Sequence, residues 1–189
     1  MRLFVALTPP EEVVRELLGV AVGLREVAPE LRWTHPEQWH LTLAFLGEVG
    51  DDLVDELTRL LGRAAARHSP LSLSLGGGGR FGHQVLWTGV RGDRDGLSGL
   101  ADSVEAAARR SRVPVEQRPY RPHLTLARAE METDLLPLVE RLAPWEGSPW
   151  RATQLHLVCS RLGAAPGEFT LHEPIAGWLL AGAARVDQE

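Results

Sequence analysis

Short segments of the chain alternate apolar and polar residues or are continuously apolar, and between them apolar residues recur at helical spacing. A period of two is typical of a strand with one buried face, and a spacing of three or four is typical of an amphipathic helix. Strand-like segments occupy 3–7, 31–34, 39–46, 71–75, 85–90, 120–127, 153–159, 169–171 and 178–180. Helix-like segments occupy 9–27, 51–67, 95–110 and 133–142. The pattern predicts an α+β protein.

Two of the predicted strands carry the same tetrapeptide, His-Leu-Thr-Leu. In the first strand, strict alternation places His40, Thr42 and Ala44 on one face. Phe45 falls on the opposite face, together with the two leucines of the motif. Two polar side chains therefore point the same way from one strand.

The second copy repeats this pattern, with His123, Thr125 and Ala127 sharing a face. The two histidines are 83 residues apart, a spacing too long for a solenoid repeat, which indicates duplicated halves. We expect a single bilobal domain over residues 1–189 in which each half carries one His-x-Thr strand. Each lobe would be an antiparallel or mixed sheet with outer helices. A pseudo-two-fold axis would bring the two motifs together across a central cleft, where the active site would lie.

Four consecutive glycines, at 76–79, predict a flexible loop. The run lacks the spacing and the Lys-Ser/Thr pair of a nucleotide-binding P-loop, so it gives little support to a phosphate cradle.

The composition, 44% apolar and 24% charged, is that of an ordinary globular protein. A run of only five apolar residues directly precedes the Thr-Pro-Pro at 8–10, too few for a signal-peptide core, and no apolar stretch approaches the about 20 residues of a membrane span. We therefore expect a cytoplasmic protein with no membrane partner. Cys159 is the sole cysteine, which excludes an intramolecular disulfide and argues against a cysteine-based zinc site. We interpret it as a small buried hydrophobic residue.

The net charge of −5 argues against a protein that coats long nucleic acids, because such binding needs a basic face. All 20 cationic residues are arginines, which a coding bias explains without a function. We assign a functional role only to Arg128, just after the second motif, since a guanidinium suits bidentate contact with a phosphate.

Residues two apart on a strand lie about 6.5 to 7 Å apart, close enough for the His and Thr of one motif to touch one phosphate. If the two strands face one another, two imidazoles flank a phosphorus atom and two hydroxyls hold its oxygens. In-line transfer needs a base on one side and an acid on the other, and histidine suits both tasks near neutral pH. The motifs therefore predict a metal-independent phosphoryl-transfer site with His40 and His123 as catalytic residues. Thr42, Thr125 and Arg128 would bind the substrate.

A lone histidine is more often structural than catalytic, and one His-x-Thr copy carries little weight. Two identical copies on matching strands favour function. Structural or surface roles are the interpretation for the remaining histidines: His35, His68, His83, His156 and His172. His156 alternates towards the cleft, yet the structural role is favoured for it. Trp33 and Trp87 are candidates to stack a base, with packing favoured for each.

Several segments resemble the two-histidine (2H) phosphoesterase superfamily, and within it the bacterial and archaeal 2′-5′ RNA ligase-like RNA 2′,3′-cyclic phosphodiesterases. The opening strand, Arg2–Leu7, is similar to theirs, and the two motif regions match at 40–49 and 120–128. The central strand at 85–90 is similar too, and 160–169 resembles the closing segment, in which the family often has Tyr where this chain has Phe169.

The resemblance implies a bilobal fold and hydrolysis of RNA 2′,3′-cyclic phosphate ends to 2′-phosphate ends, without metal or cofactor. It implies that His123 is the general base and His40 the general acid, although the residues alone leave these roles exchangeable. It also implies the reverse 2′-5′ joining reaction. The partner would be an RNA with a cyclic phosphate end or a small cyclic nucleotide, with no obligate protein partner.

Two alternatives remain open at this point. One is a module of the same fold that binds RNA ends or nucleotides without turnover. The other is a metallohydrolase that uses both histidines as ligands, although no nearby Cys or His-x-x-x-His pair completes a ligand set.

Overall fold

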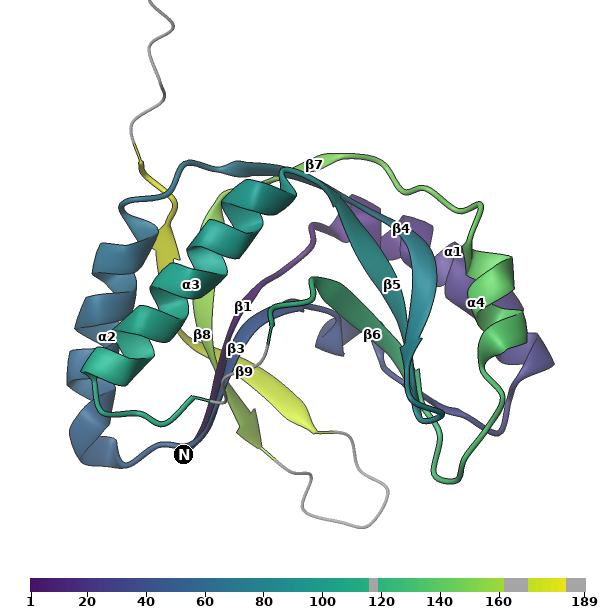
Figure 1. Ribbon diagram of the computed structural model, residues 1–189, viewed down its shortest axis with the longest axis horizontal. Helices are drawn as coiled ribbons and strands as arrows, with labels where there is room; N and C mark the ends of the chain where they lie inside the picture. The colour runs from purple at the N-terminus through teal and green to yellow at the C-terminus, as the bar shows by residue number, and fades with distance from the viewer. Residues whose placement is uncertain (116–118, 162–169, 183–189) are drawn as a thin grey trace, which may run out of the picture.

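The computed structural model describes residues 1–115, 119–161 and 170–182. Within these residues two antiparallel sheets lie between two pairs of helices (Figure 1). The helices are α1 (Glu11–Val27), α2 (Asp51–Ala65), α3 (Arg94–Arg110) and α4 (Leu136–Leu142), with a 3-10 turn η1 at Pro36–Gln38. The strands are β1 (Arg2–Leu7), β2 (Arg32–Trp33), β3 (Leu41–Glu48), β4 (Leu71–Phe81), β5 (Val85–Gly92), β6 (His123–Arg128), β7 (Trp150–Ala152), β8 (Gln154–Arg161) and β9 (Leu171–Leu179). The predicted α+β class is confirmed.

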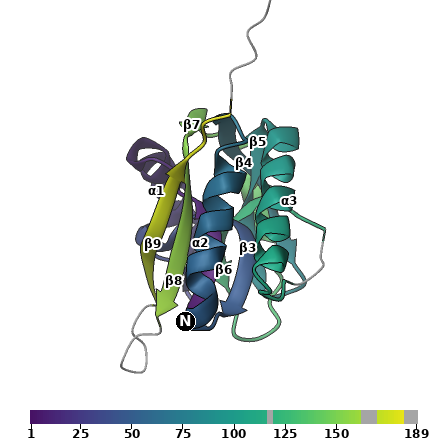
Figure 2. The same cartoon turned by 90° about the vertical axis from the view of Figure 1, so that its left-hand side faces the viewer.

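Each sheet takes strands from both halves of the chain. Sheet A has the order β3-β1-β8-β9, and sheet B has the order β2-β6-β5-β4-β7. The first half thus gives β2, β4 and β5 to sheet B, and the end of the chain gives β8 and β9 to sheet A. In Figure 2, β9 lies at the outer edge of sheet A on the side of α2, and α3 lies on the side of β3, at the other edge. The lobes are therefore not the two halves of the sequence.

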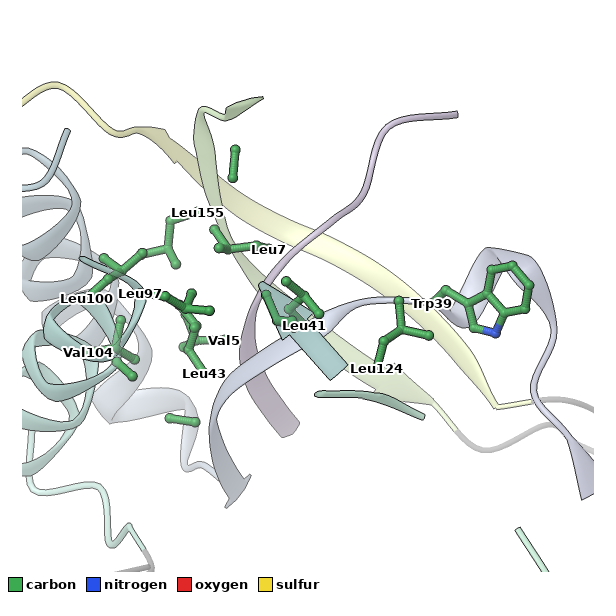
Figure 3. Packing of buried hydrophobic residues seen from close by; sticks show 14 of the residues in the cluster. Val5, Leu7, Trp39, Leu41, Leu43, Leu97, Leu100, Val104, Leu124 and Leu155 are labelled. Carbon is green, nitrogen blue, oxygen red and sulfur yellow. The ribbon is translucent and has the colours of Figure 1, made fainter. Parts of the chain in front are cut away.

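Leucines and small apolar residues form one continuous core that includes side chains of both sheets and all four helices. Val5 and Leu43 of sheet A lie close to Leu97 and Val104 of α3 (Figure 3). Leu41 and Leu124, the first leucines of the two motifs, are both fully buried in this core, and β3 contacts β6. The leucines of the motifs thus anchor the two strands, while the His and Thr between them remain only half-buried.

The glycine run is not a loop, contrary to the prediction, but part of β4, paired with β5. A bulge lies between Gly76 and Gly78, and Gly77 adopts a positive φ of 67° there, which glycine tolerates without strain. At Gly79, an added Cβ would approach the ring of Trp87 to 2.1 Å. The absence of side chains here lets a large aromatic ring lie against the strand.

Two further expectations change at the ends of elements. The last two predicted strands are one continuous strand, β9, which pairs along β8, and Phe169 lies outside the described residues. The second motif strand begins at His123 rather than at Tyr120. None of the helices in the described part of the chain has the length and apolar character that crossing a membrane requires.

Candidate active site

The His40 imidazole is held by the backbone immediately before β3. Its Nδ1 lies 2.5 Å from the carbonyl oxygen of Gln38. Since a carbonyl only accepts hydrogen bonds, Nδ1 carries the hydrogen and the neutral ring keeps its lone pair on Nε2. The Nε2 atom is therefore the one available to take or give a proton.

His123 is held in the same way in the other half. Its Nδ1 lies 2.6 Å from the carbonyl oxygen of Arg121, again two residues earlier in the chain. The same tautomer follows for the same reason. Both motif histidines thus share one local design, in which the backbone fixes the ring and leaves Nε2 free.

A β-bulge follows the first motif and reverses the predicted alternation. Thr42 pairs with Ala6, whereas Ala44 pairs with the adjacent Val5. Leu43 is therefore the extra residue of β3. Ala44 therefore joins the buried core, and Phe45 turns to the face of His40 and Thr42, where it is 64% exposed. The prediction that Ala44 shares the histidine face and Phe45 the opposite one is wrong, because a bulge shifts the period by one.

The second motif has a bulge at the equivalent place. Thr125 pairs with Trp87, whereas Ala127 pairs with Leu86 and Arg128 with Val85. Ala127 is therefore fully buried, contrary to the prediction that it shares a face with His123. Arg128 is instead turned to the face of His123 and Thr125. We call these two surfaces, the side of sheet A with His40 and the side of sheet B with His123, the motif faces.

A hydrogen-bond chain joins the two motifs. The Trp39 indole Nε1, adjacent to His40, donates to the hydroxyl of Thr34 at 2.8 Å. That hydroxyl lies 2.9 Å from the carbonyl oxygens of both Thr125 and Leu126, at the bulge of β6. The chain of bonds ties the segment before the first motif to the irregular backbone of the second. No pattern in the sequence indicates this link, since the residues involved are far apart in the chain.

Aromatic rings enclose each histidine. The His40 ring lies 4.6 Å from that of Phe4 and 5.1 Å from that of His172, measured between centroids. The His123 ring lies 4.7 Å from that of Phe81 and 6.0 Å from that of Trp87. His172, for which a structural role is predicted, thus packs against the histidine of the first motif.

The other aromatic and imidazole candidates are placed as follows. Trp87 borders the motif face of sheet B, whereas the Trp33 indole donates to the Ala28 carbonyl at 2.9 Å. The His156 Nδ1 lies 3.5 Å from the Thr8 hydroxyl. Cys159 is a buried free thiol, as predicted.

The pKa of His40 is lowered to about 4, chiefly by burial and also by the charges of His172 and His123, while the hydrogen bond to Gln38 partly opposes this shift. Burial also lowers the pKa of His123; the hydrogen bond to Arg121 raises it and the charge of Arg128 lowers it. The charge of His123 thus acts on His40, and the charge of Arg128 acts on His123. Both imidazoles therefore favour the neutral form in the unliganded protein. Among the described residues, no group of three or more His, Cys, Asp or Glu side chains is arranged to hold a metal ion.

A bilobal antiparallel α+β fold with two backbone-anchored His-x-Thr motifs defines a two-histidine phosphoesterase. The chain belongs to the 2′-5′ RNA ligase superfamily, whose model matches residues 12–163.

Two relatives and one solved structure illustrate the similarity. A protein of Escherichia coli named RNA 2′,3′-cyclic phosphodiesterase is 30% identical over 95% of this chain and 96% of its own length. A protein of the same name from Geobacillus stearothermophilus is 28% identical over 95% of this chain, which spans only 57% of that relative. The crystal structure of TT0787 from Thermus thermophilus superimposes with a TM-score of 0.81 and 28% identity, covering 97% of this chain and all of that one.

Proposed function

We propose that residues 1–189 act as one unit that hydrolyses 2′,3′-cyclic phosphates at RNA ends to 2′-phosphates, without a metal or cofactor. The observation that carries the proposal is the pair of equivalently anchored histidines, each with a free Nε2 and a threonine on the same strand face. The superfamily membership and the names of the relatives support the choice of substrate.

In the proposed reaction His123 acts as the base and His40 as the acid. The Nε2 of His123 takes a proton from water as the water oxygen bonds to phosphorus. The bond from phosphorus to the ribose O3′ breaks, and His40 Nε2 gives its proton to that oxygen, which leaves the phosphate on O2′. The low pKa of His40 in the free protein means that the substrate anion has to raise it before this step.

The remaining motif residues would bind the phosphate. Thr42 and Thr125 supply hydroxyl donors, one from each motif face. Arg128 supplies a full positive charge beside His123, where charge develops on the phosphate oxygens in the transition state. This arrangement assigns to side chains a task that a metal ion performs in other phosphodiesterases.

The deciding experiment is product analysis on a short RNA that ends in a 2′,3′-cyclic phosphate. We expect a terminal 2′-phosphate as the product, at a rate that EDTA leaves unchanged. A 3′-phosphate product would contradict the assigned leaving group, and loss of turnover in EDTA would contradict the metal-independent mechanism. Binding without turnover would favour the alternative of a module that holds RNA ends or small cyclic nucleotides.

The 2′-5′ joining reaction belongs to the same proposal. Because the base can activate a 5′-hydroxyl end in place of water, opening of the cyclic phosphate would then form an RNA 2′-5′ linkage, with O3′ again as the leaving group. Incubating the cyclic phosphate RNA with a second RNA bearing a 5′-hydroxyl tests this, with a nuclease-resistant 2′-5′ junction as the expected product.

A further inference from the structure

Sheet A adds a third histidine to the site, and it comes from the last strand of the described chain. His172 lies near the start of β9 and pairs with Ser160 of β8. Its ring meets that of His40 nearly edge-on, at 74° with centroids 5.1 Å apart. It also contacts Phe4 edge-on, with centroids 5.0 Å apart. Three rings, those of Phe4, His40 and His172, are thus in mutual contact.

The same region is bound to the anchor of His40 through Gln38. The backbone carbonyl of Gln38 accepts from His40, and its side-chain Nε2 donates to the carbonyl of Thr170 at 2.7 Å. One residue therefore holds the His40 ring and also the backbone two positions before His172. The other motif histidine has no imidazole in the corresponding place among the described residues, since its ring neighbours are Phe81 and Trp87.

We propose that His172 is a positioning residue for His40, which together with Phe4 and Gln38 holds the His40 imidazole in its reactive orientation. The expected effect of His172 on turnover rests on the proposed function. The expected effect of His172 on the orientation and pKa of His40 concerns the unliganded protein and does not. Rotation of the His40 ring away from Gln38 would drive it into one of the two rings that contact it.

Electrostatics give His172 a second effect on His40. Its Nδ1 is buried and has no hydrogen-bond partner within the described residues, and burial lowers its pKa. An imidazolium needs partners for both N–H groups, so this environment disfavours the charged ring. A proton on His172 in turn opposes a proton on His40, so the two rings compete for one charge.

Other charged groups near this pair are accounted for. On β8 and β9, Arg161 and Glu173 form an ion pair at 3.0 Å. From sheet B, His123 acts on His40 and opposes its protonation. His172 is thus the neighbour of His40 whose removal relieves one repulsive charge without breaking the hydrogen bond to Gln38.

The first test is an NMR titration of the His40 ring in the unliganded protein. In His172→Phe, which keeps a ring but removes the titrating group, we expect the His40 midpoint to move up by about half a pH unit or more. The matched control is His83→Phe, at an exposed position in the turn between β4 and β5. In this variant the midpoint of the His40 titration should not change. An unchanged His40 midpoint in His172→Phe overturns the electrostatic part of the proposal.

The second test separates positioning from mere stability. His172→Ala, which removes the packed ring, should lower kcat about 10-fold with little change in KM, and His172→Phe should recover most of that loss. The limb of the pH–rate profile that reports His40 should move to higher pH in His172→Phe. Equal kcat in both variants and the wild type overturns the positioning role. If the wild type shows no turnover, the proposed function fails, and the titration still decides whether His172 acts on His40.

Discussion

Phe45 and Arg128 occupy equivalent positions in the two halves of the protein, each three residues after the threonine of its motif. In both strands a bulge turns this residue to the face of the histidine. One motif face therefore carries an exposed aromatic ring and the other a guanidinium. The two halves share a backbone design but differ in chemistry at this position.

Arg128 should therefore contribute to turnover through its positive charge, which its counterpart Phe45 lacks. We expect Arg128→Ala to lower kcat/KM for a nucleoside 2′,3′-cyclic phosphate by about 10²- to 10³-fold, the usual effect of removing a group that stabilises transition-state charge. Arg128→Lys should be intermediate, because an ammonium keeps the charge but loses the bidentate geometry. Arg15→Ala, at an exposed position of α1, is the control. Wild-type kinetics in Arg128→Ala would exclude its contact with the phosphate.

Removal of either motif imidazole should abolish most of the turnover. His40→Ala and His123→Ala are each expected to lower kcat by about 10² to 10⁴, since each loses one proton transfer. Thr42→Ala and Thr125→Ala should cost less, because Arg128 and backbone donors remain. Steady-state assays combined with melting curves check that the variants stay folded. Substantial activity in either histidine variant would contradict two-histidine catalysis.

The hydrogen-bond chain through Thr34 should matter for both stability and activity. Thr34→Val keeps the side-chain shape but leaves the Trp39 indole without its acceptor and removes the hydroxyl donor from the carbonyls at the β6 bulge, where Leu126 keeps only the bond from the Thr34 backbone N–H. We expect a loss of about 1 to 3 kcal/mol in the free energy of unfolding, with a parallel fall in kcat. Thr34→Ser retains the hydroxyl and should stay close to the wild type. If urea denaturation gives Thr34→Val the wild-type stability, the chain of bonds does not support the site.

Gly79 should tolerate no side chain, because the ring of Trp87 occupies the space that a Cβ would take. Gly79→Ala is expected to destabilise the protein by about 1 to 3 kcal/mol and to reduce activity, since Trp87 packs near His123. Gly19→Ala on α1 is the matched control, as a Cβ there meets nothing within 4 Å. That change should stabilise the helix by up to about 1 kcal/mol. Equal unfolding free energies for both variants would refute the close packing.

Acid should destabilise the fold between about pH 6.5 and 4. The unfolded chain binds a proton at the ordinary histidine pKa, whereas folded His40 resists it down to about 4. His40 thus leaves the free energy of unfolding unchanged above pH 6.5. As the pH falls from 6.5 to 4, it lowers the free energy of unfolding by up to about 3 kcal/mol in total. In His40→Asn, the free energy of unfolding should fall less steeply over this range. Parallel curves for the two proteins, measured by denaturant titration, would show that His40 does not contribute.

Local patterns in the sequence were sufficient for the four helices and most of the strands, and for the presence of two His-x-Thr motifs on separate strands. They failed where long-range packing decides the backbone. Strict alternation assumes regular strand pairing, so it does not predict the bulges after Thr42 and Thr125. It therefore places Ala44 rather than Phe45 on the face of His40. The glycine run looked like a loop because the ring that fills its space, that of Trp87, lies on a neighbouring strand.

The contacts of the site were the hardest part to foresee. His172, two residues before a proline, belongs to no motif in the sequence, and the pairing of β9 with β8 brings it to His40. The link from Trp39 through Thr34 joins segments about 90 residues apart. No periodicity in the sequence reports such contacts. The roles of His40, His123, Thr42, Thr125 and Arg128 remain predictions that the variants above test.

The exchange of strands between the sheets has a consequence for how the molecule folds. Sheet B is incomplete without β6 and β7 from the second half, and sheet A is incomplete without β8 and β9 from the end of the chain. When only the first half of the chain has emerged from the ribosome, neither lobe can therefore be complete. His40 lacks its contact with His172 until β9 has also emerged. If the chain were cut between the halves, the two fragments would have to associate before either motif is held in place.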